Sequence, residues 1–187
     1  MDSRFSEAVA FLEHRAKSGL DCGLVVLEIY GFPHHQDCFG FAEASKSLET
    51  IEAGLKDVVA RFGGILVAGV RAEFWAICPG VTRARRFAES VSKKVSDMQI
   101  RVVDEAYARS HWRQPEEILT LTAAVLLLDG HNRYDSVEPL FNNASTLQEL
   151  ATAYRPGKIT VLDLTSNDPR RRFPTLKSIA RRFRSNR

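Results

Sequence analysis

The sequence predicts an α+β protein with a mostly antiparallel sheet flanked by helices, the palm or ferredoxin-like topology. Apolar, β-branched runs alternate with stretches of helical spacing in the order helix, strand, long helix, hairpin, long helix, strand, helix, strand. The core of that order, strand–helix–strand–strand–helix–strand, is the pattern that this topology requires. We expect the helices to pack on one face of the sheet.

Four stretches carry apolar residues at helical spacing opposite a polar face, which predicts four helices. In chain order they are 5–17, 39–62, a helix from Arg83 whose extension to Tyr107 stays open, and 137–154. Glycine ends three of them, at Gly19, at Gly63-Gly64 and at Gly157.

Five apolar runs bounded by turn residues predict strands. They are CGLVVLEIYGF at 22–32, ILVAGV at 65–70, FWAIC at 74–78, ILTLTAAVLLLDG at 118–130 and KITVLDL at 158–164. The first run is almost continuously apolar, which is typical of a buried central strand. A tight turn joins the second and third runs, so these two form a hairpin.

The basic residues are concentrated at the C-terminal end. Positions 170–187 hold eight of the 26 Lys and Arg and no acid, so 1–169 hold 18 bases against 23 acids. We expect one domain at 1–165 and a basic tail or linker helix at 166–187. A basic amphipathic helix there would bind anionic lipid, a partner's groove or nucleic acid, or it would pack on the acidic body or lead into another domain.

The rest of the composition is that of an ordinary globular protein. No apolar run reaches the roughly 18 residues of a membrane span. The three cysteines show no paired CxxC spacing, which favours reduced thiols and a cytoplasmic location. The basic pI belongs to the tail, and it therefore does not indicate a fold that binds nucleic acid.

Two carboxylates lie where the predicted fold brings segments together. Glu28 interrupts the first strand, and Glu73 lies in the polar turn of GVRAEFWAIC. In a palm topology the middle of the first strand lies beside the hairpin turn. Carboxylates at these two places can share a Mg²⁺ ion, which prefers oxygen ligands and substrate phosphates.

These segments resemble the GGDEF domain of diguanylate cyclases over nearly the whole chain. LVVLEIYGF is similar to the first strand of the family, QDCFGF to the segment that opens its next helix, and AGVRAEFWAICPG to its signature hairpin. LTLTAAVLLLDG and NASTLQELATAYRPGKITVLDL resemble its later strands and last helix. The resemblance implies the fold of GGDEF and nucleotidyl cyclase domains, and a chemistry that joins two GTP molecules into cyclic di-GMP.

Carried onto this sequence, the family's metal site is incomplete. Its first aspartate falls on Glu28, and the main-chain carbonyl of Ile29 remains as a ligand. Its second carboxylate falls on Ala72, which offers no side-chain oxygen. The two signature glycines, which let the substrate approach the turn, fall on Val70 and Arg71, although Arg71 could contact phosphate.

The family's nucleotide-binding positions are altered as well. Its guanine-binding asparagine falls on Gln36, a longer amide, and its guanine-binding aspartate falls on Ser45. Thr152 or Tyr154 stands at the phosphate-binding lysine, and Lys158 is a loose match to the phosphate-binding arginine.

Structural readings of the same residues stay open. Glu28 would pair with Arg71 across the hairpin, or face solvent, because an unpaired buried carboxylate is costly. The adjacent pair His34-His35 would point in different directions in an extended loop, which argues against a metal site. Of the family's inhibitory arginine-x-x-aspartate motif, Arg61 remains while Gly64 replaces the aspartate.

We therefore predict a catalytically inactive GGDEF-like domain that acts as a protein-interaction or regulatory module in bacterial cyclic di-GMP signalling. In this reading Glu28 and Glu73 are vestigial, and no metal or other cofactor is bound. The alternative is a divergent diguanylate cyclase or GTP-binding allosteric domain that uses Mg²⁺ and GTP. The expected partner is a protein or an adjoining signalling domain. A homodimer, and a membrane or partner contact through 170–187, stay open, whereas specific nucleic acid is not expected.

Overall fold

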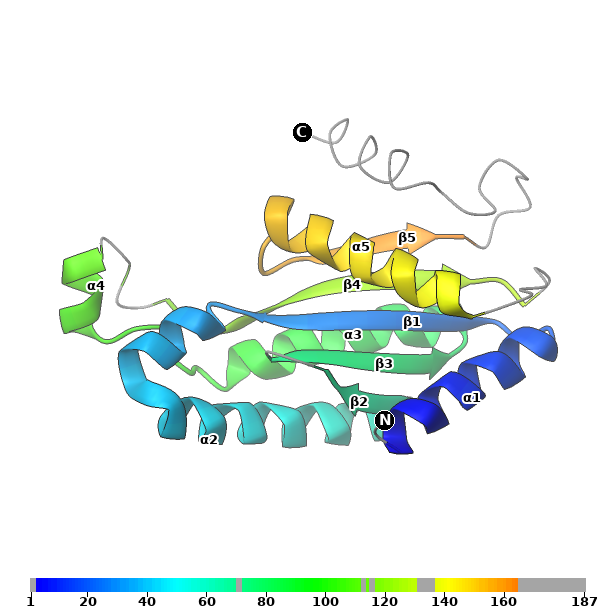
Figure 1. The fold of residues 1–187 in the computed structure, drawn as a ribbon, viewed down its shortest axis with the longest axis horizontal. Helices are drawn as coiled ribbons and strands as arrows, with labels where there is room; N and C mark the ends of the chain where they lie inside the picture. Colours follow the sequence, from blue (N-terminus) through cyan, green and yellow to red (C-terminus); the bar gives the residue numbers. More distant parts are fainter. Residues whose placement is uncertain (1–2, 70–71, 112–113, 115–116, 131–136, 165–187) are drawn as a thin grey trace.

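The computed structural model describes residues 3–69, 72–111, 114, 117–130 and 137–164, in which a five-stranded sheet is flanked by helices (Figure 1). The strands are β1 (Cys22–Tyr30), β2 (Ile65–Ala68), β3 (Glu73–Pro79), β4 (Thr120–Leu128) and β5 (Ile159–Asp163). The helices are α1 (Ser3–Lys17), α2 (Phe32–Arg61), α3 (Val81–Asp97), α4 (Glu105–His111) and α5 (Glu138–Tyr154). The expected tail at 166–187 lies outside the described residues.

The sheet is mostly antiparallel, as the sequence predicts. Its strand order is β2-β3-β1-β4-β5, which makes β1 the central strand. β1 runs antiparallel to β3 and β4, β2 runs antiparallel to β3, and β4 runs parallel to β5. The apolar run at 22–30 is therefore paired along both of its edges.

Helices cover both faces of the sheet, so the prediction that they pack on one face is wrong. One face of β1 presents Val25 and Leu27 to a core shared with α2 and α3. The other face presents Leu24 and Val26 to a second core shared with α1 and α5. The physical reason is the continuous apolar run of β1, because a strand that is apolar on both faces needs cover on both.

Helix α2 begins at Phe32 rather than at 39 and contains a bend. Gly31 precedes it with φ of 89°, and a proline occupies its first turn, where no amide hydrogen is needed. At Gly40 the backbone leaves helical geometry, with φ of 81° and ψ of 166°, so two helical pieces meet at an angle. The bend creates a short N-terminal arm at 32–39.

The third helix ends at Asp97, so the open extension to Tyr107 does not occur. Gln99 takes a positive φ of 53°, and its side-chain amide donates to the carbonyl of Ser96 at 2.8 Å. The chain then runs extended beside 117–119, where Val102 donates its amide to the carbonyl of Glu117 at 2.8 Å. The separate helix α4 follows.

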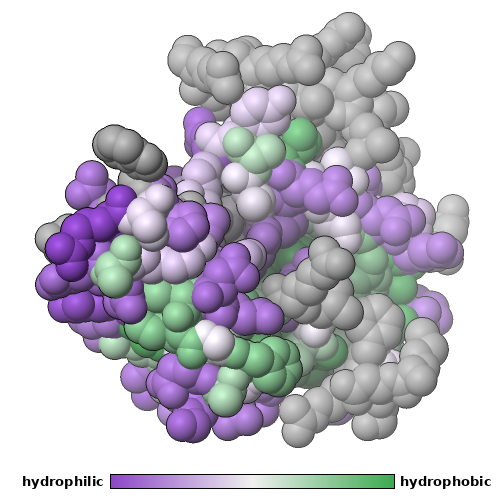
Figure 2. Space-filling view, turned by 60° about the vertical axis from the view of Figure 1, so that its left-hand side comes forward, coloured by the Kyte–Doolittle hydropathy of each residue, from purple (hydrophilic) through white to green (hydrophobic). Residues whose placement is uncertain are grey.

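The surface at the end of the molecule that carries α4 and the bend of α2 is chemically mixed. Figure 2 turns this end forward and shows hydrophobic side chains gathered in a patch among hydrophilic ones. Phe41, which directly follows the bend, has the largest exposed fraction of the large hydrophobic side chains in the described residues, at 76%.

Candidate functional site at the hairpin end of β1

The two carboxylates singled out in the sequence are neighbours in the sheet. The antiparallel register of β1 and β3 places Glu28 directly opposite Glu73, and that of β1 and β4 places Glu28 opposite Thr122. Side chains directly opposite on neighbouring strands point to the same face. Glu28, Glu73 and Thr122 therefore share the face of the sheet that α5 covers.

Glu28 is held by side chains of α5. The hydroxyl of Thr152 donates to Oε2 of Glu28, and the amide of Gln148 donates to the same oxygen at 3.3 Å. Gln148 also lies 3.3 Å from the carbonyl oxygen of Thr122 and 3.2 Å from the hydroxyl of Thr152. The side chain is thus partly buried, and its Oε2 accepts hydrogen bonds from neutral donors.

Glu73 is partly buried beside it and accepts a hydrogen bond from the indole nitrogen of Trp75. Burial raises the pKa of the Glu73 carboxyl above its ordinary value of 4.5; the Trp75 hydrogen bond opposes this change, and the negative charge of Glu28 adds to it. The Trp75 ring in turn packs on Phe141 of α5, with ring centroids 5.4 Å apart. Two like charges therefore face each other under one helix.

Replacing Glu73 with glutamine should stabilise the protein at neutral pH by about 0.5 kcal/mol, because like charges directly opposite in a sheet repel. Because the pKa of Glu73 is raised in the folded state, the free energy of unfolding of the wild-type protein falls as pH rises through that pKa. The advantage of Glu73→Gln should therefore shrink as pH falls toward the ordinary pKa of 4.5. Urea unfolding at several pH values measures this dependence.

The matched control is Glu149→Gln on the exposed side of α5. It removes the same charge away from the pair, so we expect little change in the free energy of unfolding at any pH. A Glu73→Gln variant that is less stable than the parent at neutral pH would contradict the repulsion argument.

The hairpin turn packs its backbone against β1. Ala72 has a positive φ of 64° and is 5% exposed, and its carbonyl accepts the amide hydrogen of Ile29 at 3.2 Å. Val70 and Arg71 lie outside the described residues, and so does the expected ion pair between Glu28 and Arg71. Ala72 brings no oxygen-bearing side chain to this position.

The residues present do not fit a Mg²⁺ ion of the kind that the resemblance implies. Magnesium demands near-octahedral oxygen coordination. Ala72 supplies no side-chain oxygen, and Glu28 already accepts hydrogen bonds from Thr152 and Gln148. Within the described ranges, no three His, Cys, Asp or Glu side chains gather as a metal site.

The structure does not bring the other candidate residues to this pair. Gln36 is exposed in the arm of α2, and Ser45 is partly buried beyond the bend at Gly40. Arg61 is exposed in the last turn of α2, and Lys158 is exposed in the turn before β5. The candidate site therefore consists of the carboxylate pair and its neighbours on α5.

His35 has a structural role. It is 3% exposed, and its Nδ1 donates to the carbonyl of Arg101 at 2.8 Å, since a carbonyl only accepts. Its Nε2 lies 3.0 Å from the hydroxyl of Ser47 beyond the bend. The ring therefore ties the arm of α2 to the rest of that helix and to the segment before α4.

Sequence reasoning missed the contacts from α5. Thr152 was singled out only as a replacement for a phosphate-binding lysine, and Gln148 was not singled out at all. A polar pair at i and i+4 inside an otherwise apolar helix face was the available signal. It could not show which strand residue the pair would meet.

Comparison with solved structures defines the fold class. The GGDEF domain of DgcB from Caulobacter crescentus, in complex with c-di-GMP, is 15% identical with a TM-score of 0.67, covering 84% of this chain and 86% of that one. The active GGEEF domain of a diguanylate cyclase from Vibrio cholerae is 14% identical with a TM-score of 0.66, covering 83% and 92%. Both are cyclase domains of one fold.

A third structure is a complex with another protein. Diguanylate cyclase SiaD from Pseudomonas aeruginosa, in complex with its activator SiaC, is 16% identical with a TM-score of 0.65, covering 85% of this chain and 58% of that one. No protein-family model and no curated protein matches the sequence. The chain has the GGDEF-domain fold, as predicted. Among the described helices, none is long and apolar enough to cross a membrane.

Proposed function

We propose that this chain is a catalytically inactive GGDEF-like domain that acts as a protein-interaction or regulatory module in cyclic di-GMP signalling. The observation that carries the proposal is the state of Glu28, which is hydrogen-bonded to Thr152 and Gln148 and lies in the strand next to the turn of Ala72. The cytoplasmic location and the division at 165 belong to the same proposal.

Loss of the metal would remove the central element of the chemistry. A bound divalent ion activates a hydroxyl and neutralises phosphate charge during phosphoryl-type transfer. An ion here would bind Glu28 through Oε1 alone or share Oε2 with the donors of α5, and Ala72 would add no ligand. The complex of SiaD with its activator supports a role for protein contacts in domains of this fold.

The alternative, a divergent cyclase or a GTP-binding allosteric domain, is favoured by one observation. Glu28 and Glu73 lie directly opposite each other, so two carboxylates do converge at the hairpin end of β1. A metal ion between them would relieve their repulsion. This reading needs the ion to bind Oε1 of Glu28 or to share Oε2 with the hydroxyl of Thr152.

A titration of fluorescent GTP analogue in millimolar Mg²⁺ tests the proposal. We expect no saturable change in fluorescence up to millimolar nucleotide, and no cyclic di-GMP after prolonged incubation with GTP. Saturable binding together with product would overturn the inactive reading and establish the divergent cyclase. Saturable binding without product would establish the GTP-binding allosteric domain instead.

Ala72→Asp is the companion variant for this titration. It restores a carboxylate at the hairpin, in a left-handed conformation that aspartate tolerates better than most residues. We expect the variant to bind Mn²⁺ more tightly than the parent, because a second charged ligand is added. Equal Mn²⁺ affinities would show that the missing carboxylate is not what weakens the site.

A further inference from the structure

Positive charge is concentrated on α3 and on the turn between α5 and β5. Helix α3 holds five basic residues against the two acids Glu89 and Asp97, and the turn adds Arg155 and Lys158. The basic residues of α3 are Arg83, Arg85, Arg86, Lys93 and Lys94. In positions 1–169 acids outnumber bases by 23 to 18. The positive charge of α3 and the turn therefore contrasts with the net negative charge of the rest of this part.

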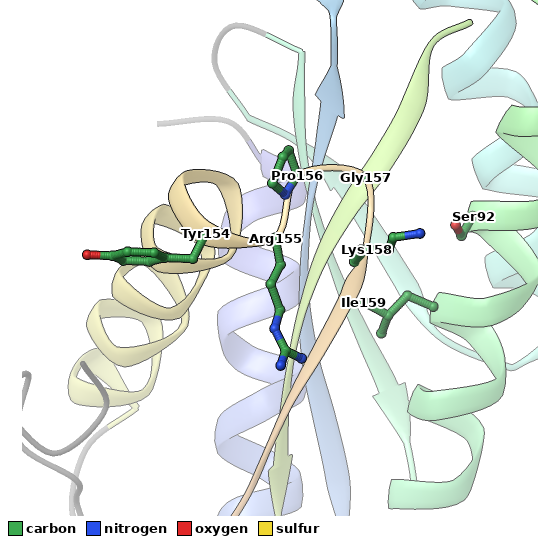
Figure 3. A pocket seen from close by; sticks show the side chains of 7 residues that line it. All are labelled: Ser92, Tyr154, Arg155, Pro156, Gly157, Lys158 and Ile159. Carbon is green, nitrogen blue, oxygen red and sulfur yellow. The ribbon is translucent and has the colours of Figure 1, made fainter. Parts of the chain in front are cut away.

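An open pocket of about 700 Å³ lies within this basic region. It is lined by residues of α3, of the end of α5 and of the start of β5, namely Ser92, Tyr154, Arg155, Pro156, Gly157, Lys158 and Ile159. Figure 3 shows Lys158 and Ile159 extending toward Ser92, whereas Tyr154 points away from α3. Arg155 and Lys158 are exposed, and the structure shows no acidic partner for either within the described residues.

Beyond the pocket, the α3 side of β5 continues with alternate residues of the strand. Ile159 lines the pocket at one end of the strand, and Asp163 accepts a 2.8 Å hydrogen bond from Arg85 of α3 at the other. Alternate strand residues point to one face, so Val161 lies between them. Its side chain is 38% exposed, and β5 is an edge strand.

We name the set Ser92, Arg155, Lys158, Ile159 and Val161 the α3–β5 strip. It begins with a hydroxyl and two cations that have no acidic partner among the described residues. It continues with two apolar side chains and ends at the Arg85–Asp163 ion pair. Glu89 is three residues before Ser92 and four after Arg85, so it shares their side of the helix. Because Glu89 offsets the positive charge on this side of α3, the cationic end of the strip consists of Arg155 and Lys158 in the turn.

We propose that the α3–β5 strip binds an acidic, extended segment of a partner protein. Carboxylates of the segment pair with Arg155 and Lys158, and an apolar side chain of the segment covers Ile159 and Val161. We infer an acidic partner from charge complementarity, because exposed cations beside an apolar strand fit a segment in which acidic and apolar side chains alternate. The inference rests on the proposed function and names the surface and the partner chemistry for it.

Two other classes of partner fit the strip less well. A membrane-surface helix needs an exposed apolar face. The apolar face of α3 is buried in the core and consists of Ala84, Phe87, Ala88, Val91 and Val95. Nucleic acid needs a run of cations along its phosphates, whereas the strip has only two, and the carboxylates of Glu89 and Asp163 lie on the α3 and β5 residues next to it. An acidic segment needs only the two cations at the turn.

The test uses the full chain and a short fluorescein-labelled peptide that is rich in Asp and Glu with one central Leu. Fluorescence anisotropy measures its affinity, and amide chemical shifts of the isotope-labelled protein map its position. We expect saturable binding that weakens as NaCl is raised, with shifts concentrated at Ser92 and at 158–161. A peptide with Lys in place of every acid should not bind.

The variant Arg155→Glu/Lys158→Glu should weaken peptide affinity by about tenfold or more, because like charges then face each other. The matched control, Lys17→Glu/Lys46→Glu, changes the net charge equally at exposed positions on α1 and α2. It should weaken affinity by less than about threefold. The basic positions at 170–187 are unchanged in both, so they cannot account for a difference.

Three outcomes would overturn the inference. The first is an equal loss of affinity in the two double variants, and the second is peptide shifts that lie outside the strip. The third is binding of phosphatidylserine vesicles or duplex DNA at the strip, with no binding of the acidic peptide. None of these creates GTP turnover, so failure here is distinguishable from failure of the inactive-domain proposal.

Discussion

Replacing Gly23 with alanine is expected to destabilise the folded protein by about 3 kcal/mol, the upper part of the usual range for overpacking. Gly23 lies in the central strand β1, and a Cβ built on it would lie 2.1 Å from the Cβ of Ala84 on α3. The Ala84 methyl is fixed to a helix backbone, so only a shift of α3 relieves the contact. Urea unfolding of the parent and Gly23→Ala measures the effect.

A second substitution tests whether this contact is the cause. Ala84→Gly removes the opposing methyl and by itself costs about 1 kcal/mol, as glycine does in a helix. In the double variant we expect the two costs to be strongly non-additive, because the clash is gone. Additive losses would place the damage of Gly23→Ala elsewhere, for instance in strand pairing.

Replacing His35 with alanine is expected to cost about 3 kcal/mol, because the carbonyl of Arg101 and the hydroxyl of Ser47 lose a buried partner and a cavity opens. The ring also packs on Phe39, with ring centroids 4.9 Å apart. Since His35 joins the two pieces of α2 across Gly40, the arm at 32–39 should lose amide-exchange protection first. Urea unfolding and hydrogen exchange provide the two measurements.

His34→Ala is the matched control for this prediction. His34 is next in the chain and less buried, and in the described part of the chain no hydrogen bond or ring contact involves it. We expect a change within about 0.5 kcal/mol, as for most surface substitutions. If the two histidine variants unfold at the same urea concentration, the hydrogen bonds of His35 with Arg101 and Ser47 contribute nothing to stability.

The sheet was largely predictable because its signals are local. The runs predicted at 22–32, 65–70 and 118–130 are apolar and bounded by turn residues, and they contain β1, β2 and β4, which are a few residues shorter. Helix ends were harder to place. The helix predicted at 39–62 begins at Phe32, because Pro33 fits a first turn, and it bends at Gly40 and continues. After Asp97 no glycine or proline marks the end of α3, since Gln99 itself takes the positive φ.

The candidate site was predictable only in its strands. Glu28 and Glu73 could be paired from sequence because a hairpin beside a central strand sets the register. The contact between Glu28 and Thr152 joins residues 124 positions apart and depends on how α5 docks on the sheet. The same docking decides that Glu28 accepts hydrogen bonds from neutral donors, and no periodicity in the sequence encodes it.

The place of β1 at the centre of the sheet has a consequence for biosynthesis. β1 is the first strand to leave the ribosome, yet its partners β3 and β4 begin only at Glu73 and Thr120. Until they emerge, its apolar run has unpaired edges and is prone to association with other nascent chains. Helix α5 follows β4 in the chain, so it can close over Glu28 only after both neighbours of β1 have been translated.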